Sequence, residues 1–311
     1  MDQQSTAVII MVRPDHFGFN PQTAETNPFM HTPQALHKNE EEIRDAAVAE
    51  FESMVSTLRA NDVTVHVLPS RTDVMTPDAV FPNNWFSHHQ DGRLVLYPML
   101  TPNRRLERQN KTLVELLKKN NIPVSKIIDL TADEKKGRIL ESTGSMVLDR
   151  VNKIAFALAS SRTIEKEFEK WCKTMDYEGV YIVTSNTHKA EVYHSNLFIS
   201  IGTAFAVVCL DVIENAEEQE LIKKELEHLG KEVIAINLKQ VYAFCGNILE
   251  LQTKDGKKKI IMSKTAWHAF TGEQLLRLKK QGEIITIEIP VIEEVGGGGV
   301  RCMMAEVFPR V

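Results

Sequence analysis

A repeated order of elements constrains the fold of this chain more than any other feature of its sequence. Each repeat reads as two strands joined by a hairpin turn, followed by a helix and a closing strand. In one repeat, alternating apolar residues flank a turn at 91–94, helical spacing covers 103–120, and a short strand covers 124–130. Such periodicity is typical of chains built from repeated units. The first strands of four repeats hold small or polar residues at separations of 61, 51 and 51 residues, namely Asn84, Ser145, Asn196 and Asn247.

The first repeat is split between the two ends of the chain. Residues 6–14, 41–61 and 63–69 supply a strand, a helix and a strand, and residues 300–307 supply the strand that this repeat lacks. A C-terminal strand that completes the first unit would close the chain into a ring, as in β-propellers. We therefore predict an α/β fold with one catalytic domain over 1–311, a ring of five such units. The alternative is an α/β protein with an open mixed sheet.

The composition is that of an ordinary globular protein, with 43% apolar residues, 25% charged residues and a formal net charge of −5. This balance disfavours nucleic acid as a partner, because nucleic-acid binding needs a basic surface. The longest apolar stretch, 196–213, contains Gly, Ser, Thr and Asp and predicts paired strands rather than a membrane span. No secretory signal is recognisable, and none of the four cysteines lies in a Cys-x-x-Cys pair. We expect a cytoplasmic protein with free thiols and no membrane partner.

Several polar residues would meet at the centre of such a ring, because they interrupt the first strands of the repeats. A thiol, an imidazole and a carboxylate among them suit covalent chemistry at a trigonal carbon. Cys302 would attack, His194 would protonate the leaving amine and then activate water, and Glu141 would orient the imidazole or polarise the substrate. The whole set is Asn83, Asn84, Glu141, His194, Asn196 and Cys302.

Each of these residues also has an ordinary structural explanation. A single cysteine is more often a small buried apolar residue, but glycines at 296–299 precede Cys302 and let the backbone approach a ligand closely. His194 is equally compatible with a structural role, whereas Glu141 opens an apolar strand where an unpaired carboxylate is costly. The His88–His89 doublet suggests a metal, but the spacing offers no further ligands, so solvated or hairpin-end histidines are favoured. The other three cysteines lie in apolar patterns and are predicted to be core residues.

Five segments resemble motifs of the guanidino-group modifying enzymes, the amidinotransferase and arginine deiminase superfamily. They occur in order, one in each repeat, and the likeness spans the chain and is closest to the citrulline-utilisation hydrolases. This resemblance implies the pentein fold, a five-bladed αβ propeller, in agreement with the repeat. The segments are MVRPDHFGFNPQTAETNPF at 11–29, DAVFPNNWFSHH at 78–89, LESTGSMVLDR at 140–150, VYHSNLFISIG at 192–202 and GGGGVRCMMAEV at 296–307.

The resemblance implies a role for individual residues. Cys302 matches the nucleophile after a Gly-Gly run, His194 the histidine of a His-x-Asp motif, and Glu141 the glutamate of a Glu-Gly-Gly-Asp motif, although ESTGS lacks the final Asp. Asn84 and Asn196 stand where arginine-processing members carry aspartates. Carboxylates favour a cationic guanidinium, whereas the donor and acceptor of an amide suit a neutral ureido group.

The predicted function is therefore that of a cysteine-dependent hydrolase that cleaves a C–N bond of citrulline or a similar ureido compound through a covalent intermediate. One alternative is an enzyme like arginine deiminase or dimethylarginine hydrolase, and another is an amidinotransferase. A ring-shaped binding module without catalysis is a further alternative, because fold does not fix function.

Binding of the amino-acid end of the substrate needs further residues. Asp78 and Asn83 share a segment with Asn84, and all three are substrate-binding candidates together with Asn196. Arg301 and Arg13 are candidates for the carboxylate of the substrate, and residues 20–31 are a candidate covering loop. We expect a small amino-acid-like substrate, no metal or organic cofactor and, from the resemblance, a homodimer.

Overall fold

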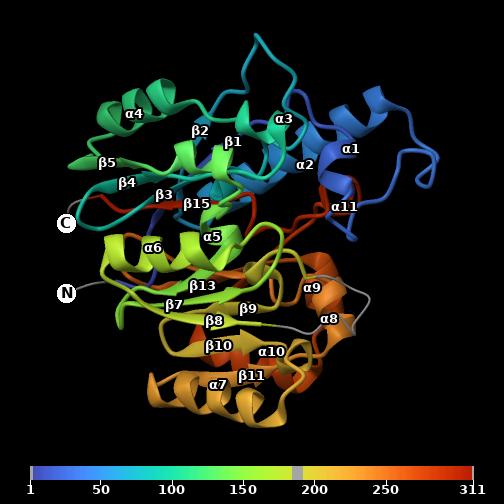
Figure 1. Ribbon diagram of the computed structural model, residues 1–311. Coiled ribbons are helices and arrows are strands. Elements are labelled where there is room, and N and C mark those ends of the chain that lie inside the picture. Colours follow the sequence, from blue (N-terminus) through green and yellow to red (C-terminus); the bar gives the residue numbers. More distant parts are fainter. Residues whose placement is uncertain (1–2, 184–191, 310–311) are drawn as a thin grey trace.

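The computed structural model describes residues 3–183 and 192–309, and within them the chain has a mixed α/β fold with five sheets of three strands (Figure 1). In each sheet the middle strand pairs antiparallel with one neighbour and parallel with the other. We call the antiparallel neighbour the first strand of its sheet. The sheets are β15 (Ala305–Val307), β1 (Val8–Val12) and β2 (Thr64–Leu68); β3 (Phe86–His88), β4 (Arg93–Leu96) and β5 (Lys126–Asp129); β6 (Met146–Asp149), β7 (Ile154–Leu158) and β8 (Glu178–Ile182); β9 (Ile199–Ile201), β10 (Phe205–Val208) and β11 (Glu232–Ala235); and β12 (Leu249–Gln252), β13 (Lys258–Ser263) and β14 (Glu283–Ile287).

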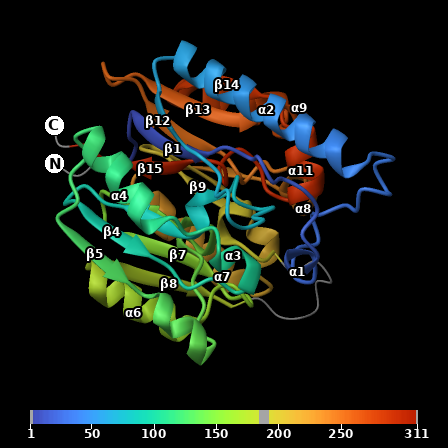
Figure 2. The same ribbon diagram turned by 90° about the horizontal axis from the view of Figure 1, so that it is seen from above.

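A helix connects the middle strand of each sheet to its parallel neighbour, because parallel strands need a crossover connection. These helices lie on the outside of the sheets, as α4 and α7 show in Figure 1 and α2 and α6 show in Figure 2. The crossover helices are α2 (Glu40–Ala60), α4 (Asn110–Lys119), α6 (Glu165–Met175), α7 (Ala216–His228) and α10 (Gly272–Gln281). The shorter helices are α1 (Pro21–Ala24), α3 (Pro102–Arg105), α5 (Ser142–Ser145), α8 (Leu238–Tyr242), α9 (Lys264–Ala269) and α11 (Pro290–Gly296), with 3₁₀ turns at Pro82–Asn84, Thr131–Lys136, Ser195–Leu197 and Leu210–Val212.

Helix α2 illustrates how the sequence builds these crossovers. Asn39 and Glu42 form a capping box that satisfies backbone N–H groups at its start. Its buried residues, among them Ile43, Ala47 and Phe51, recur every four residues and face the sheet of β1 and β2. The helix therefore forms because one stripe is apolar and its first turn is capped.

Strands from the two ends of the chain form one sheet, as the split repeat predicted. Strand β15 pairs antiparallel with β1, with Val8 opposite Val307 and Ile10 opposite Ala305. His88 holds the chain just beyond β15, because its Nδ1 accepts a hydrogen bond from the Phe308 N–H at 3.0 Å. Its Nε2 then carries the proton and donates to the Pro123 carbonyl at 2.7 Å.

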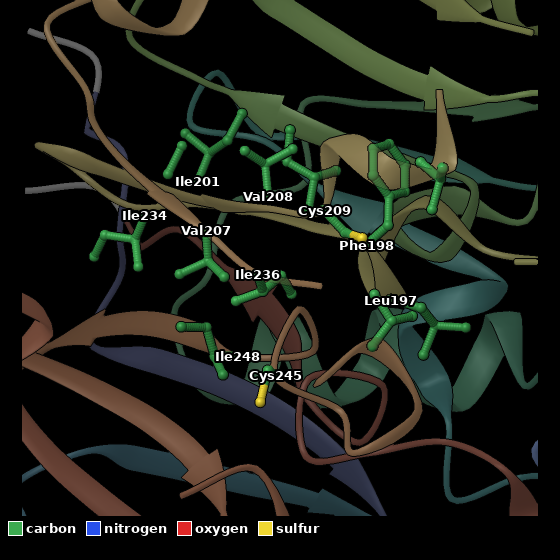
Figure 3. Close-up of a cluster of buried hydrophobic side chains, with 14 of the residues drawn as sticks. Leu197, Phe198, Ile201, Val207, Val208, Cys209, Ile234, Ile236, Cys245 and Ile248 are labelled. Carbon is green, nitrogen blue, oxygen red and sulfur yellow. The ribbon is translucent and has the colours of Figure 1, made fainter. Parts of the chain in front are cut away.

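The cysteines other than Cys302 are core residues, as predicted. Cys209 and Cys245 pack among buried aliphatic side chains of β10, β11 and the segment before β12 (Figure 3). Cys172 lies in the apolar cluster beneath α6. Burial raises the pKa of all three thiols to about 12, so they are poor nucleophiles.

One detail of the sequence interpretation was wrong, and a second was right only in part. The four small or polar residues expected inside first strands all precede those strands. Asn84 and Asn196 lie in 3₁₀ turns two or three residues before β3 and β9, Ser145 ends α5, and Asn247 lies two residues before β12. The two 3₁₀ turns satisfy their own backbone through hydrogen bonds such as Phe198 N–H to Ser195 O, so they tolerate burial. The His88–His89 doublet lies at the hairpin end, where β3 finishes before the turn into β4, as one of the two alternatives expected, but it is buried rather than solvated. Within the described residues, no group of His, Cys, Asp and Glu has the arrangement of a metal site.

We predict that His88→Ala destabilises the fold by about 2–4 kcal/mol, because it removes two buried hydrogen bonds and leaves a cavity. Urea unfolding measures the free energy of unfolding. The control is His66→Ala, at a partly exposed position of β2. Equal losses for the two variants would contradict a special role for His88 in holding the C-terminal segment.

Candidate active site

The turns before the first strands bring side chains from distant parts of the sequence into one buried pocket. Its empty volume, counting the space that opens to solvent, is about 240 Å³. Cys302 and His194, expected to meet at the centre of the fold, both line it and are only 3% and 2% exposed. The complete lining is Thr23, Asn27, Asp78, Phe81, Asn84, Arg104, Arg162, Tyr193, His194, Gly296, Gly298 and Cys302.

Cys302 lies in a turn that follows the glycine run and precedes β15. Its backbone N–H donates to the Gly299 carbonyl at 3.1 Å, which folds the turn back on itself. Its Sγ contacts the side-chain amides of Asn247 and Asn196, with Nδ2–Sγ distances of 3.3 and 3.7 Å. Burial raises the pKa of the thiol, against the opposing effect of Asn247 and the Arg301 charge. The thiol is therefore protonated at neutral pH and needs a base.

His194 is held by Glu141, with 2.8 Å between His194 Nε2 and Glu141 Oε2. Burial lowers the pKa of His194 to about 4, although the carboxylate opposes that shift, so the imidazole is neutral at neutral pH. Because an ionised carboxylate only accepts, Nε2 carries the proton and Nδ1 has the free lone pair. The pair thus provides one nitrogen able to accept a proton, as a general base requires.

Glu141 stays ionised although it is fully buried. Burial alone would raise its pKa, but Arg162 and the hydrogen bond from His194 outweigh this effect and bring the pKa far below its usual value. Arg162 Nη1 lies 3.4 Å from Oε2, and the Leu100 N–H donates to Oε1 at 3.0 Å. The negative charge therefore has several partners, as a buried charge requires.

Gly144, in the ESTGS segment, gives Asn84 and His194 the space that they occupy. A Cβ at this position would lie 2.4 Å from Asn84 Nδ2 and 2.9 Å from His194 Cε1. Both neighbours are buried and held by hydrogen bonds, so neither can retreat freely. The glycine is therefore required by close packing at the site.

Asn84 is oriented by an arginine that sequence analysis missed. Its Oδ1 accepts from Arg104 Nη1 at 3.0 Å, and its Nδ2 donates to Asn83 Oδ1 at 3.0 Å. Arg104 is itself fixed by Glu107, through Nε and Nη2 at 2.8 and 3.1 Å. Asn83 thus supports Asn84 from behind and is not part of the pocket lining.

Asp78 presents an unpartnered carboxylate oxygen to the same pocket. Its Oδ2 accepts from Asn20 Nδ2 and Thr23 Oγ1, both at 2.6 Å, and Arg104 Nε is 3.6 Å away. Its Oδ1 is buried and has no hydrogen-bond partner among residues 3–183 and 192–309. A buried acceptor left free at a pocket wall is available to a donor on a ligand.

Arg162 is the second pocket arginine that sequence analysis missed. Its Nη2 donates to Thr23 O and Thr26 Oγ1 at 3.1 and 2.8 Å, and its guanidinium carbon lies 4.7 Å from the ring centre of Tyr193. Its Nε is buried without a partner in the part of the chain that the structure describes. The pocket therefore offers both an unpartnered acceptor, on Asp78, and an unpartnered donor.

The repeat itself contained a signal for both arginines. Arg104 follows Asn84 by 20 residues, and Arg162 follows Ser145, the corresponding residue of the next repeat, by 17, so each comes shortly after the middle strand of its sheet, β4 or β7. Comparison of the repeats beyond their first strands would have identified the two positions together.

Arg13 and Arg301 lie outside this pocket. Arg13 is partly exposed and forms salt bridges with Asp15 and Glu52, so its guanidinium is committed to the surface. Arg301 is buried and donates to Glu306 Oε2 at 2.9 Å. It lines a separate small cavity, together with Asn196 and Arg150, that does not include Cys302 or His194.

The predicted covering loop contributes directly to the pocket wall. Thr23 and Asn27 line the pocket, and Asn27 Nδ2 donates to the carbonyls of Gly296 and Gly297 at 3.4 Å. Phe29 packs edge-on against Tyr193 at 6.0 Å between ring centres. The segment therefore closes the pocket above the glycine run.

Comparisons with known proteins identify relatives of the whole chain. A family model for the eukaryotic N,N dimethylarginine dimethylhydrolases matches residues 13–309. The N-terminal domain of ArgZ, an arginine dihydrolase from cyanobacteria solved with bound substrate, is 16% identical over 97% of this chain and 98% of that chain, with a TM-score of 0.73. AgrE bound to L-arginine is 18% identical over 98% of this chain but 42% of that longer chain, with a TM-score of 0.73.

A dimethylarginine dimethylaminohydrolase carrying an S-methyl-L-thiocitrulline adduct is 15% identical over 98% of this chain and 99% of that chain, with a TM-score of 0.61. At such identities these structures show a shared fold. No curated protein sequence matches the chain. Of the helices in the described ranges, none has the length and apolar character needed to cross a membrane.

We predict that Gly144→Ala lowers the free energy of unfolding by about 1–3 kcal/mol, because the new methyl group overpacks the site. The matched control is Gly18→Ala, where a Cβ meets nothing within 4 Å, and we expect a change within about 0.5 kcal/mol. Chemical denaturation of both variants checks the difference. Equal stability of the two would show that the contacts of Gly144 with Asn84 and His194 are not restrictive.

Proposed function

This chain belongs to the eukaryotic N,N dimethylarginine dimethylhydrolase family, and from that membership we propose that it cleaves a C–N bond at the guanidino carbon of arginine or an N-methylated arginine. The family places it among the hydrolases of the amidinotransferase superfamily that act on C–N bonds. One observation carries the proposal: Cys302, His194 and the free atoms of Asp78 and Arg162 share a single buried pocket.

The sequence alone favoured citrulline as the substrate. The present proposal favours a guanidino compound in its place. The family match and the complex of AgrE with L-arginine support that change. Asp78 adds a carboxylate to the pocket, which suits a substrate with cationic groups. Its free Oδ1 would accept from the α-ammonium group, and the free Nε of Arg162 would donate to the α-carboxylate.

The reaction would follow from the protonation states of the site. His194 Nδ1 takes the proton of the Cys302 thiol, and the thiolate attacks the guanidino carbon. The C–N bond to the outer nitrogen then breaks, and that nitrogen leaves as ammonia or a methylated amine with the proton from His194. Water adds to the remaining S-linked carbon as His194 accepts its proton. The C–S bond breaks, and the electron pair returns to sulfur with the release of citrulline.

A second candidate is hydrolysis that continues from citrulline to ornithine, ammonia and carbon dioxide. The amides of Asn84 and Asn196 favour this extension. Each offers a donor and an acceptor that match a neutral ureido group, whereas an aspartate at either position would suit a cation and match the ureido group poorly. ArgZ, the relative with the same fold, is an arginine dihydrolase. Transfer of the amidino group to an amine in place of water is the remaining alternative, decided by access of water to the intermediate.

The arrangement of the sheets supports one closed catalytic domain over residues 1–311, a five-bladed propeller. First strands of different sheets lie side by side, with β15 against β3 and β9 against both β6 and β12. Strand β15 completes the sheet of β1, as closure requires. A reducing compartment such as the cytoplasm would keep the nucleophile free. A homodimer stays a prediction.

We expect Cys302→Ala to lower turnover at least about 1,000-fold while the protein stays folded, because the variant lacks the nucleophile. The assay supplies arginine, N-methylated arginines and citrulline, and measures citrulline, ornithine and ammonia. The control is Cys172→Ala, which removes a buried core thiol. Turnover retained in the Cys302 variant would reject the mechanism. If the native protein is active only when an acceptor amine is added, amidino transfer would be favoured over hydrolysis.

We expect Asn84→Asp to raise the ratio of kcat/KM for arginine over citrulline about tenfold, because the added carboxylate favours a cation and opposes a neutral ureido group. Pairing of that carboxylate with Arg104 limits the size of the change. The same substitution at Asn120, at the end of α4, serves as a control for the added charge. An unchanged ratio at position 84 would reject the contribution of this side chain to substrate choice.

A further inference from the structure

Two buried amide groups contact the sulfur of Cys302, and the nearer belongs to a residue that the mechanism above does not use. Asn247 Nδ2 lies 3.3 Å from Sγ, and Asn196 Nδ2 lies 3.7 Å from it. Both asparagines are buried, with 1% of each exposed. A side-chain amide at this distance is a hydrogen-bond donor to a thiolate.

The orientation of the Asn247 amide is fixed by two backbone partners. Its Oδ1 accepts from the Arg301 N–H at 3.1 Å, which only a carbonyl oxygen can do. Its Nδ2 donates to the Asn196 carbonyl at 3.0 Å, which only the amino group can do. The second hydrogen of Nδ2 is therefore the one directed toward Sγ, and no flip of the amide preserves both backbone bonds.

The glycine run makes room for this arrangement. A Cβ at Gly299 would lie 2.7 Å from Asn247 Oδ1, and the Gly299 carbonyl accepts from the Cys302 N–H at 3.1 Å. The same turn thus shapes the backbone of the nucleophile and leaves space for the amide beside it. Asn247 and Cys302 occupy corresponding positions in their repeats, each two or three residues before a first strand.

Formation of a thiolate at Cys302 needs such donors, because burial removes the water that would otherwise stabilise the charge. The neighbouring cation, Arg301, directs Nη1 to the Met304 carbonyl and Nη2 to Glu306. Side-chain amides are thus the groups whose hydrogen bonds to Sγ the structure records. Asn247 is the nearer of them and the one with a fixed orientation.

We infer that Asn247 is a catalytic residue, whose Nδ2–H stabilises the Cys302 thiolate; this inference rests on the function proposed above. The hydrogen bond strengthens when the thiol proton moves to His194 Nδ1 and negative charge develops on sulfur. It strengthens again when the C–S bond breaks and the electron pair returns to sulfur. Asn247 gains and loses no proton in either step.

The test compares the pH dependence of Cys302 alkylation by iodoacetamide in Asn247→Ala and in the native protein. The alkylation rate of Cys302→Ala, which reports the three core thiols, is subtracted as background. We expect the alkylation pKa to rise and the rate at pH 7 to fall about 10- to 100-fold. We also expect kcat to fall while KM changes little. A pKa that is unchanged or lower would overturn the inference, because loss of packing alone would admit water and lower the pKa toward that of an ordinary thiol.

Asn247→Asp has nearly the same shape as the native protein and provides a second measurement of the Cys302 pKa. This variant keeps the test valid if Asn247→Ala fails to fold. Its carboxylate would raise the thiol pKa at least as far, and a lower pKa would again count against the inference. Gln240→Ala is the control for loss of a buried amide away from the sulfur, and we expect no change in alkylation. Alkylation of Cys302 needs no substrate, so it tests this inference independently of the proposed function. Turnover in Cys302→Ala would reject the proposed function, whereas an unchanged or lower alkylation pKa in Asn247→Ala would reject this inference.

Discussion

The buried negative charge of Glu141 is the interaction on which the rest of the site depends. It is compensated by Arg162 and by the hydrogen bond from His194, and together these partners hold the imidazole in one tautomer. Because Glu141 and Arg162 belong to one repeat and His194 to the next, the charge also links two neighbouring units of the fold. A buried carboxylate without these partners would cost several kcal/mol, so the fold and the chemistry rest on the same contacts.

The site combines full charges with neutral amides. Asp78, Arg104 and Arg162 provide charges on one part of its lining, whereas Asn196 and Asn247 contact the sulfur as neutral groups. Charges suit the recognition of an amino acid, whose ends are ionised throughout catalysis. Neutral donors suit an atom whose charge appears and disappears within each cycle, because they require no counter-ion when that charge is absent.

The repeat predicted the five sheets and the split first unit because alternation, turn residues and helical spacing are local signals. It failed to predict the turns at Asn84 and Asn196, since a single 3₁₀ turn inside an apolar segment has little sequence signature. Arg104 was missed because its neighbours Arg105 and Arg108 look the same in sequence. Tertiary packing, which buries Arg104 and leaves Arg105 partly exposed, decides between them.

The position of Cys302 near the end of the chain determines when the site can form during synthesis. Every other residue that lines the pocket precedes it in the chain, so a ribosome adds the sulfur last. The strand that follows its turn, β15, pairs with β1 near the opposite end of the sequence. An unfinished polypeptide can fold several of its sheets and still be chemically inert, so reactivity is withheld until translation has passed this residue.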